Sequence, residues 1–178
     1  MPVTFSTPRL DVRPLTRDDL QPFHAIWSDP AVIFWGAMST LNATRRFLEQ
    51  VIGRRYDGHE HTGWFAVVSK EHGHVVGDVV LVPSSWDALK PEIGWHFARR
   101  HHGRGFATEA ATGLLDHARR LGIGQVFAKI LPTNHPSRRV ARRVGMQVVG
   151  RLPHDYAEHE LWATIGTWNR GTPPTPQS

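Results

Sequence analysis

The 178-residue chain contains no cysteine. This absence excludes disulfide bonds, thiolate zinc sites and a cysteine nucleophile. No run of about 18 apolar residues occurs, which excludes an ordinary transmembrane helix. The first residues, Met1 to Phe5, lack the basic start and apolar stretch of a signal peptide. We therefore expect a cytoplasmic protein that has no membrane partner.

The composition is that of a folded domain. Hydrophobic residues make up 40% of the chain and charged residues 21%, whereas disordered chains have fewer apolar residues and coiled coils show persistent heptads. The length suits one domain with a core of its own. We expect a single domain over residues 1–170 and a disordered, proline-containing tail over residues 171–178.

The positive charge is concentrated in one segment. The chain has a formal net charge of +5, while residues 99–151 hold eleven basic and two acidic side chains, a local excess of +9. The segments on either side, 1–98 and 152–178, each come to −2. Any anionic partner is therefore expected at residues 99–151, and nucleic acid is one candidate.

Hydrophobic periodicity predicts strands alternating with helices. A hairpin is expected around residues 70–73, and Gly122 is expected to end the longest helix. Ser137 is expected to cap a short helix that ends at Val144. The predicted strands are one within 7–15 and then 64–68, 75–82, 92–97, 125–130, 146–152 and 161–168. The predicted helices are 16–27, one that is capped near Thr40 or Asn42 and reaches Tyr56, 106–121 and 137–144.

The segment Arg100-His101-His102-Gly103-Arg104-Gly105 lies between a predicted strand and the longest predicted helix. Its glycines allow successive N–H groups to point into one concavity, and the helix adds its dipole, so the segment can hold a pyrophosphate. A glycine-rich turn with a solvated basic rim is the alternative. No Gly-Lys-Ser/Thr of a Walker A loop follows, and Thr108 occupies the position of the third glycine of a Rossmann fingerprint.

This loop, with Glu92-Ile93-Gly94-Trp95 before it and Phe106-Ala107-Thr108-Glu109-Ala110 after it, resembles the cofactor motif of the GNAT superfamily of N-acetyltransferases. Asn134-His135-Pro136-Ser137 and Arg143-Val144-Gly145-Met146 are similar to that superfamily's N-x-x-S and K-x-G-F elements.

Further segments resemble the Rim branch, which includes acetyltransferases of ribosomal-protein N-termini. These are Thr7-Pro8-Arg9-Leu10 with Arg13-Pro14-Leu15, then Trp27-Ser28-Asp29-Pro30, and the late Trp168. The resemblance extends from about Thr7 to Arg170.

The resemblance implies an α/β (mixed α+β) fold, with a twisted, mainly antiparallel sheet of about six to seven strands flanked by about four helices. It implies acetyl-CoA as the acetyl donor, in a splay between strands 92–97 and 125–130, with its pyrophosphate on amides from Arg100 to Thr108. The residues expected to bind it are Phe97, Ala98, Arg99, Arg100, His102, Gly103, Arg104, Gly105, Phe106, Ala107, Thr108, Asn134, Ser137 and Arg143.

Acetyl transfer needs a base, because the attacking amine is mostly protonated at neutral pH. Glu92 is the first candidate, directly or through water, although it could be a surface carboxylate. The alternatives are Glu158, Glu160 and His96.

The catalytic residues expected beside this base are Asn134, near the thioester, and Ser137, where the thiol sulfur should arrive. Many superfamily members carry a tyrosine where this chain has Ala141, so either Ser137 supplies the acid or the thiolate leaves without one. Tyr56 and Tyr156 are the only tyrosines, and both lie outside the motif. Trp35, beside Gly36, is the aromatic residue expected to line the acceptor pocket.

The predicted activity is therefore direct N-acetylation of a primary amine, either a protein N-terminus or a small molecule. A covalent enzyme intermediate is not expected, since the chain has no cysteine and no G-x-S-x-G elbow. A non-catalytic acyl-CoA sensor and a nucleic-acid module at residues 99–151 are the alternatives. The nucleic-acid module is disfavoured because the two aromatics there, Phe106 and Phe127, suit the core. Monomer and homodimer both remain open.

Two basic features have ordinary interpretations. The twelve histidines form no H-E-x-x-H pattern, and pairs such as His59/His61 and His72/His74 fall in predicted loops, so no metal site is expected. The arginines of residues 138–143 are expected to form a solvated helix face. Contact with the 3′-phosphate of CoA is the second interpretation and nucleic acid the third.

Overall fold

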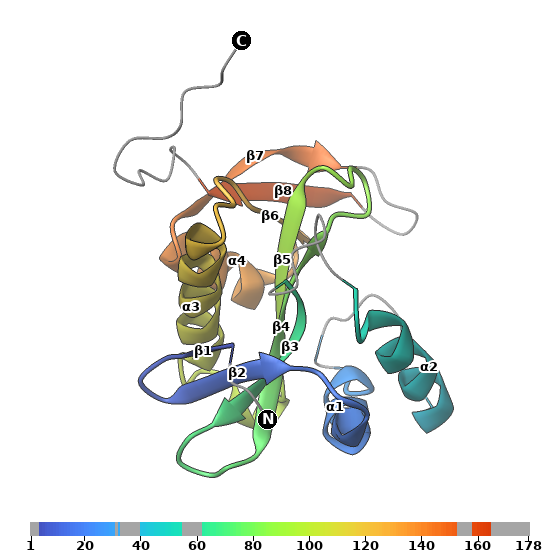
Figure 1. The fold of residues 1–178 in the computed structure, drawn as a ribbon. Helices are drawn as coiled ribbons and strands as arrows, with labels where there is room; N and C mark the ends of the chain where they lie inside the picture. The colour runs from blue at the N-terminus through green and yellow to red at the C-terminus, as the bar shows by residue number, and fades with distance from the viewer. Residues whose placement is uncertain (1–3, 31, 33–39, 55–61, 153–157, 165–178) are drawn as a thin grey trace.

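The computed structural model describes residues 4–30, 32, 40–54, 62–152 and 158–164 (Figure 1). They form an α+β fold in which one mixed, mostly antiparallel sheet is flanked by four α-helices. The expected architecture is thus confirmed. The sheet has eight strands rather than six or seven, because the short segment Phe5–Ser6 adds a strand at one edge.

The elements follow the predicted order along the chain. Short 3-10 turns at Arg17–Asp19 and Arg99–His101 precede α1 and α3, respectively. The strands are β1 (Phe5–Ser6), β2 (Leu10–Pro14), β3 (Gly63–Ser69), β4 (Val75–Pro83), β5 (Pro91–Phe97), β6 (Phe127–Ile130), β7 (Met146–Leu152) and β8 (His159–Thr164), and the helices are α1 (Leu20–Trp27), α2 (Leu41–Val51), α3 (Phe106–Arg120) and α4 (His135–Arg143).

The strand order is β1-β2-β3-β4-β5-β6-β8-β7. Among the described strands, all neighbours are antiparallel except β5 and β6, which are parallel and joined through α3. This parallel pair has a single register match, Glu92 with Phe127. The two strands therefore separate beyond Glu92, where the family resemblance implied a splay between them.

Each face of the sheet has its own core, because alternate side chains of a strand point to opposite faces. Ile93 and Phe97 of β5 belong to the core under α3, with Leu114. Val80 of β4 belongs to the core under α1 and α2, with Trp27. Figure 1 shows the two helix pairs on opposite sides of the sheet. A ligand group that enters the splay could therefore contact side chains from both faces of the sheet.

The helix starts agree with the sequence, with one correction. Thr40 caps α2 by accepting a hydrogen bond from the amide of Ala43 at 3.1 Å. The predicted cap of α4, Ser137, is wrong. Asn134 is the cap, and its Oδ1 accepts from the amide of Ser137 at 3.1 Å. The Asn-x-x-Ser spacing is thus the spacing of a cap and the third residue of a helix.

Several residues named in the sequence analysis lie outside the described residues. They include Trp35, the predicted acceptor-pocket aromatic, the two tyrosines Tyr56 and Tyr156, Trp168 and the tail 171–178. Within the described ranges, no helix is both long enough and apolar enough to span a membrane.

Candidate active site

The loop between β5 and α3 presents a row of backbone donors. Gly103 and Gly105 have φ angles of +77° and +80°, a region that glycine enters without steric cost. The first hydrogen bond of α3 runs from Glu109 N to Gly105 O. Among the described residues, none of the amides from Gly103 to Thr108 has a hydrogen-bond acceptor. These donors lie at the positive end of the helix dipole, so their arrangement fits a diphosphate.

Two of the amides predicted to bind pyrophosphate have other partners. His101 N donates to Ala98 O at 2.8 Å and His102 N donates to Arg99 O at 3.0 Å, which forms the 3-10 turn. His101 is buried, and burial together with the nearby Arg100 lowers its pKa. The donor row therefore begins at Gly103 rather than at Arg100.

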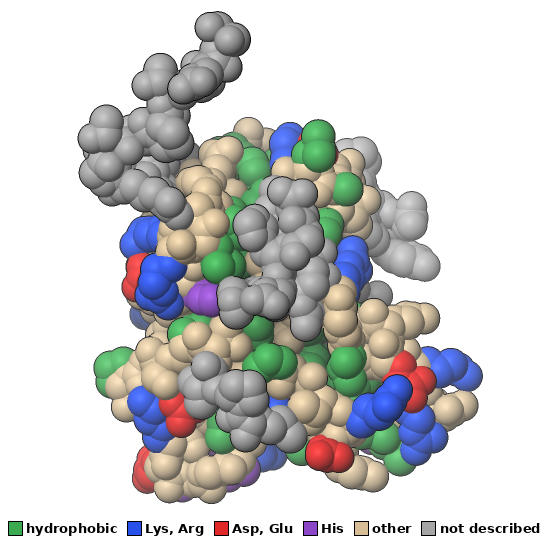
Figure 2. Space-filling view, viewed as in Figure 1, with side chains coloured by type: hydrophobic (Ala, Val, Ile, Leu, Met, Phe, Trp, Pro, Cys, Tyr) green, Lys and Arg blue, Asp and Glu red, His purple; other side chains and the backbone are tan. Residues whose placement is uncertain are grey.

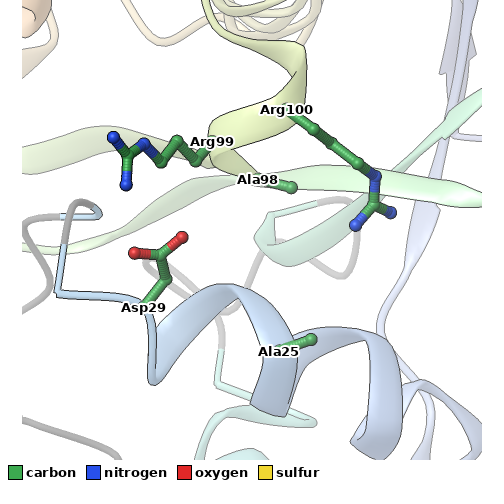
Figure 3. Close-up of a pocket in the computed structure, with 5 residues that line it drawn as sticks. All are labelled: Ala25, Asp29, Ala98, Arg99 and Arg100. Carbon is green, nitrogen blue, oxygen red and sulfur yellow. The ribbon is translucent and has the colours of Figure 1, made fainter.

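The arginines of this segment surround the loop. Arg99, Arg100 and Arg104 are exposed. Arg99 and Arg100, with Ala25, Asp29 and Ala98, line a surface hollow of about 510 Å³ between the loop and α1 (Figure 3). In this view the two guanidinium groups extend in opposite directions from the turn. Counter-charge for an anion is thus available at the loop.

The main chain of β5 offers hydrogen-bonding groups to the splay. Ala98 N donates to Val76 O of β4 at 3.0 Å, so the Ala98 amide is used in the sheet. Hydrogen bonding alternates along an antiparallel ladder, and the groups of Trp95 and Phe97 therefore point to the other edge, towards β6. His102 Nε2 donates to Phe97 O at 2.8 Å. The groups that fit a pantetheine arm are those of Trp95 and the amide of Phe97, because His102 already binds the Phe97 carbonyl and β4 binds the Ala98 amide.

Glu92 lies at the point where β5 and β6 meet. Its side chain is 15% exposed, and its Oε2 lies 3.8 Å from Nζ of Lys129, which is 7% exposed. The same Nζ donates to Ser85 Oγ at 2.5 Å. Burial raises the pKa of Glu92, while Lys129, the backbone of Ser85 and Arg54 act in the opposite direction. A carboxylate with a raised pKa at such a junction suits proton transfer near neutral pH.

A second titratable group lies on the same face of β5. His96 Nδ1 donates to Asp78 Oδ2 at 2.8 Å, and Trp27 Nε1 donates to Asp78 Oδ1 at 2.9 Å. Between Glu92 and His96 this face has only Gly94, where a Cβ would lie 3.0 Å from a methyl of Val80 and 4.0 Å from His96 Cε1. The carboxylate and the imidazole thus lie on either side of a position that has no side chain.

The other two alternatives for the base are engaged in ion pairs. Glu160 accepts from Arg138 Nε at 2.9 Å and from Nη2 at 3.1 Å, and Trp162 Nε1 donates to it as well. Glu158 is exposed and pairs with Arg151 at 2.8 Å. The expectation that all arginines of α4 are solvated is wrong for Arg138, because Glu160 holds it against β8.

The remaining predicted residues lie at the two ends of α4. Asn134 and Ser137 form its first turn, and Ser137 is partly buried. Arg143 is exposed at the other end of the helix. The helix packs against α3 and β7, so Asn134, Ser137 and the loop belong to one side of the sheet.

Sequence reasoning missed Lys129 and Asp78. Asp78 carried a usable signal, since it is the one charged residue in the apolar run Val75–Val82 and such a residue is buried only with partners. No group of three metal-ligating side chains occurs in the ranges that the structure describes.

Comparisons with known proteins identify the family of the chain. The family model described as the acetyltransferase (GNAT) domain matches residues 9–147. The uncharacterised N-acetyltransferase p20 of Bacillus licheniformis is 27% identical over 157 residues, which cover 86% of each chain.

Two solved structures share the fold. An acetyltransferase of the GNAT family from Bacillus anthracis superposes with a TM-score of 0.74 at 24% identity, covering 93% of this chain and 98% of the other. RimL, a ribosomal L7/L12 α-N-protein acetyltransferase solved in complex with coenzyme A, superposes with a TM-score of 0.75 at 18% identity, covering 92% and 98%.

Proposed function

Because the chain belongs to the GNAT family of acetyltransferases, we propose that it moves an acetyl group from acetyl-CoA directly to a primary amine on the α1–α2 side of β5. The observation that carries this proposal is the donor row from Gly103 to Thr108, next to the splay between β5 and β6. Enzymes of the family use acetyl-CoA, and RimL, which shares the fold, was solved with coenzyme A.

The residues around the loop fit this donor. The amides of Gly103 to Thr108 would hold the pyrophosphate, and Arg99, Arg100 and Arg104 would balance its charge. Main-chain groups of Trp95 and Phe97 would pair with the pantetheine arm. Arg143 is exposed on α4 and would take the 3′-phosphate. Bound in this way, acetyl-CoA supplies an activated thioester carbonyl in the splay.

Glu92 would take the proton of the acceptor amine, directly or through one water. The amine nitrogen then forms a bond to the carbonyl carbon as the carbon–sulfur bond breaks, and the sulfur keeps the electron pair. Main-chain N–H groups of β5 would stabilise the negative charge that develops on the carbonyl oxygen. No covalent enzyme intermediate is required.

Ser137 would donate its hydroxyl proton to the departing sulfur and would regain a proton from the acceptor nitrogen, which loses its second proton as the amide forms. Its position depends on Asn134, which fixes the first turn of α4 through the 3.1 Å contact with the Ser137 amide. The amide nitrogen of Asn134 would bind the pantetheine arm near the thioester. In this proposal Asn134 both orients the acid and contacts the donor.

For the acceptor we propose a protein N-terminus, on the resemblance of the opening segment to the Rim branch. A small-molecule amine is the second candidate, because the family resemblance alone does not distinguish the two.

The test is calorimetry with acetyl-CoA, followed by thiol release in a panel of small amines and ribosomal-protein peptides. We expect acetyl-CoA to bind in the micromolar range and one acceptor class to be acetylated. No binding of acetyl-CoA would reject the donor assignment. Binding without acetylation of any amine would favour the acyl-CoA sensor, and affinity for nucleic acid that falls steeply with salt would favour the basic module.

A further inference from the structure

Glu109 lies where an acidic side chain suits the helix dipole but opposes an anionic ligand at the same helix end. It is one of two acidic side chains in the basic segment 99–151, and it lies in the first turn of α3, directly after the donor row. A carboxylate there repels an anion that binds the same helix end. The side chain is 15% exposed, so water alone does not screen its charge.

The carboxylate is engaged by the N-terminal segment of the chain. Thr7 Oγ1 donates to Glu109 Oε1 at 2.6 Å, and Arg9 N donates to the same oxygen at 2.8 Å. Arg9 Nε donates to Oε2 at 2.6 Å. These hydrogen bonds lower the pKa of Glu109 against the opposing effect of burial, so the group is ionised and its charge is compensated by Arg9.

Arg9 also holds the loop itself. Its Nη1 donates to the carbonyl of Arg104 at 3.0 Å, and its guanidinium lies 4.7 Å from the ring centre of Phe106. A Cβ placed on Gly105 would lie 3.4 Å from Arg9 Nη2. One side chain thus contacts Arg104 and Phe106, the residues on either side of Gly105. The Arg104 carbonyl and the Gly105 N–H belong to one trans peptide unit, so holding the carbonyl fixes the Gly105 amide in the opposite direction.

We propose that Arg9 is a positioning residue for acetyl-CoA binding. It neutralises Glu109 and fixes the Arg104 carbonyl, so that the backbone N–H groups of the loop face the pyrophosphate without a competing negative charge. Arg9 itself does not touch the donor. The proposal rests on the proposed function, since it requires that the loop binds the pyrophosphate of acetyl-CoA. It also gives a role to the Thr7-Pro8-Arg9-Leu10 segment.

The test compares two donors in the full-length protein. Acetyl-CoA carries the pyrophosphate, and acetyl-pantetheine lacks it. In R9M we expect the dissociation constant of acetyl-CoA to rise about tenfold, because the Glu109 carboxylate is left uncompensated beside the bound pyrophosphate. The dissociation constant of acetyl-pantetheine, measured by its displacement of bound acetyl-CoA at millimolar concentration, should stay in R9M within about twofold of the wild-type value.

Two further variants separate the contributions. R9M/E109Q removes the uncompensated carboxylate, and it should regain acetyl-CoA affinity relative to R9M, because the repulsion is gone. R119M is the matched control, since Arg119 has a similar exposure and pairs with Asp116 on the same helix at 2.7 Å. It should bind acetyl-CoA as the wild type does. Thermal unfolding of all variants reports any loss of fold.

Three results would overturn the proposal. They are unchanged acetyl-CoA affinity in R9M, an equal loss for both donors, and no recovery in R9M/E109Q. A failure of the proposed function gives a different result. If the wild type does not bind acetyl-CoA, the assignment of acetyl-CoA as the donor fails. If the wild type binds it and R9M binds it equally well, only the role of Arg9 is rejected.

Discussion

The carboxylate of Glu92 lies 3.8 Å from the ammonium nitrogen of Lys129, across the single register pair that joins β5 to β6. Burial raises the pKa of this carboxyl group, and Lys129 limits the rise. The same lysine holds Ser85 of the β4–β5 loop at 2.5 Å. One buried cation therefore links three chain segments at the place where the proposed base must act.

The pH profile of acetyl transfer should report Glu92. The ionised carboxylate is the active form of a base, and its pKa is raised. The rate should therefore fall as the pH drops through a value above that of an ordinary carboxyl group. E92Q should lose roughly 10²-fold or more in kcat while keeping its affinity for acetyl-CoA. A profile that E92Q leaves unchanged in shape would exclude Glu92 as the base.

Removal of Lys129 should shift that profile. In K129M the carboxylate loses its nearest positive charge, so the pKa of Glu92 rises further and the acidic limb moves to higher pH. K90M is the control, because Lys90 is near the same strands, over the Phe127 ring at 5.6 Å, but pairs with Asp87. An equal shift in both variants would point to a general loss of positive charge rather than to the contact with Glu92.

Gly105 should be intolerant of a side chain. Its φ of +80° is costly for any other residue, and a branched side chain there would press on Arg9. G105V should weaken acetyl-CoA binding by at least about tenfold, since a strain of roughly 1–2 kcal/mol acts on the donor row. Gly124 has open space around it and an ordinary φ, so G124V should bind normally. Retained affinity in G105V would show that the loop is only a turn.

Asn134 and Ser137 should separate stability from chemistry. N134A removes the cap of α4 and should lower the free energy of unfolding by about 1 kcal/mol. S137A keeps the cap, because its amide still reaches Asn134, so its stability should be unchanged while kcat falls by roughly 10²-fold. Denaturant unfolding measures the stability of both variants, and steady-state kinetics measure their kcat. Equal kinetics for S137A and wild type would mean that the sulfur leaves without help from this hydroxyl.

Asp78 should be important for folding. It is fully buried and accepts hydrogen bonds from Trp27 of α1 and His96 of β5. D78A takes away the acceptor that both groups share, which should cost about 2–4 kcal/mol in unfolding free energy. The control is D87A, at a half-buried loop position where the carboxylate has a 3.5 Å ion pair with Lys90 and accepts from the Leu89 amide at 3.0 Å. Similar stability for the two variants would contradict this assignment.

Much of the fold could be predicted because local patterns decide it. The apolar stripe of α3 and the hairpin between β3 and β4 follow from spacing and turn residues, and both lie where the sequence places them. The strand Phe5–Ser6 was missed, since two residues carry no periodicity and its pairing depends on β2.

The site was less accessible to sequence analysis. In the sequence, Lys129 lies two residues after Phe127 in a short strand and looks like an ordinary surface lysine. Its burial depends on the register between β5 and β6, which the α3 crossover sets and no local pattern records. Likewise the Asn134 motif could be found, but whether asparagine or serine caps α4 depended on the backbone at residue 134.

The lone contact between β5 and β6 also has a mechanical meaning. The sheet consists of two parts, one formed by strands β1 to β5 and the other by β6, β8 and β7. A single register pair between β5 and β6 joins them. Tension applied across that junction meets little backbone resistance, and the load passes instead to α3, which packs against strands on one side and against α4 on the other. A molecule bound between β5 and β6 would contact both parts of the sheet. Single-molecule pulling that separates the two parts should therefore record a higher rupture force when that molecule is bound.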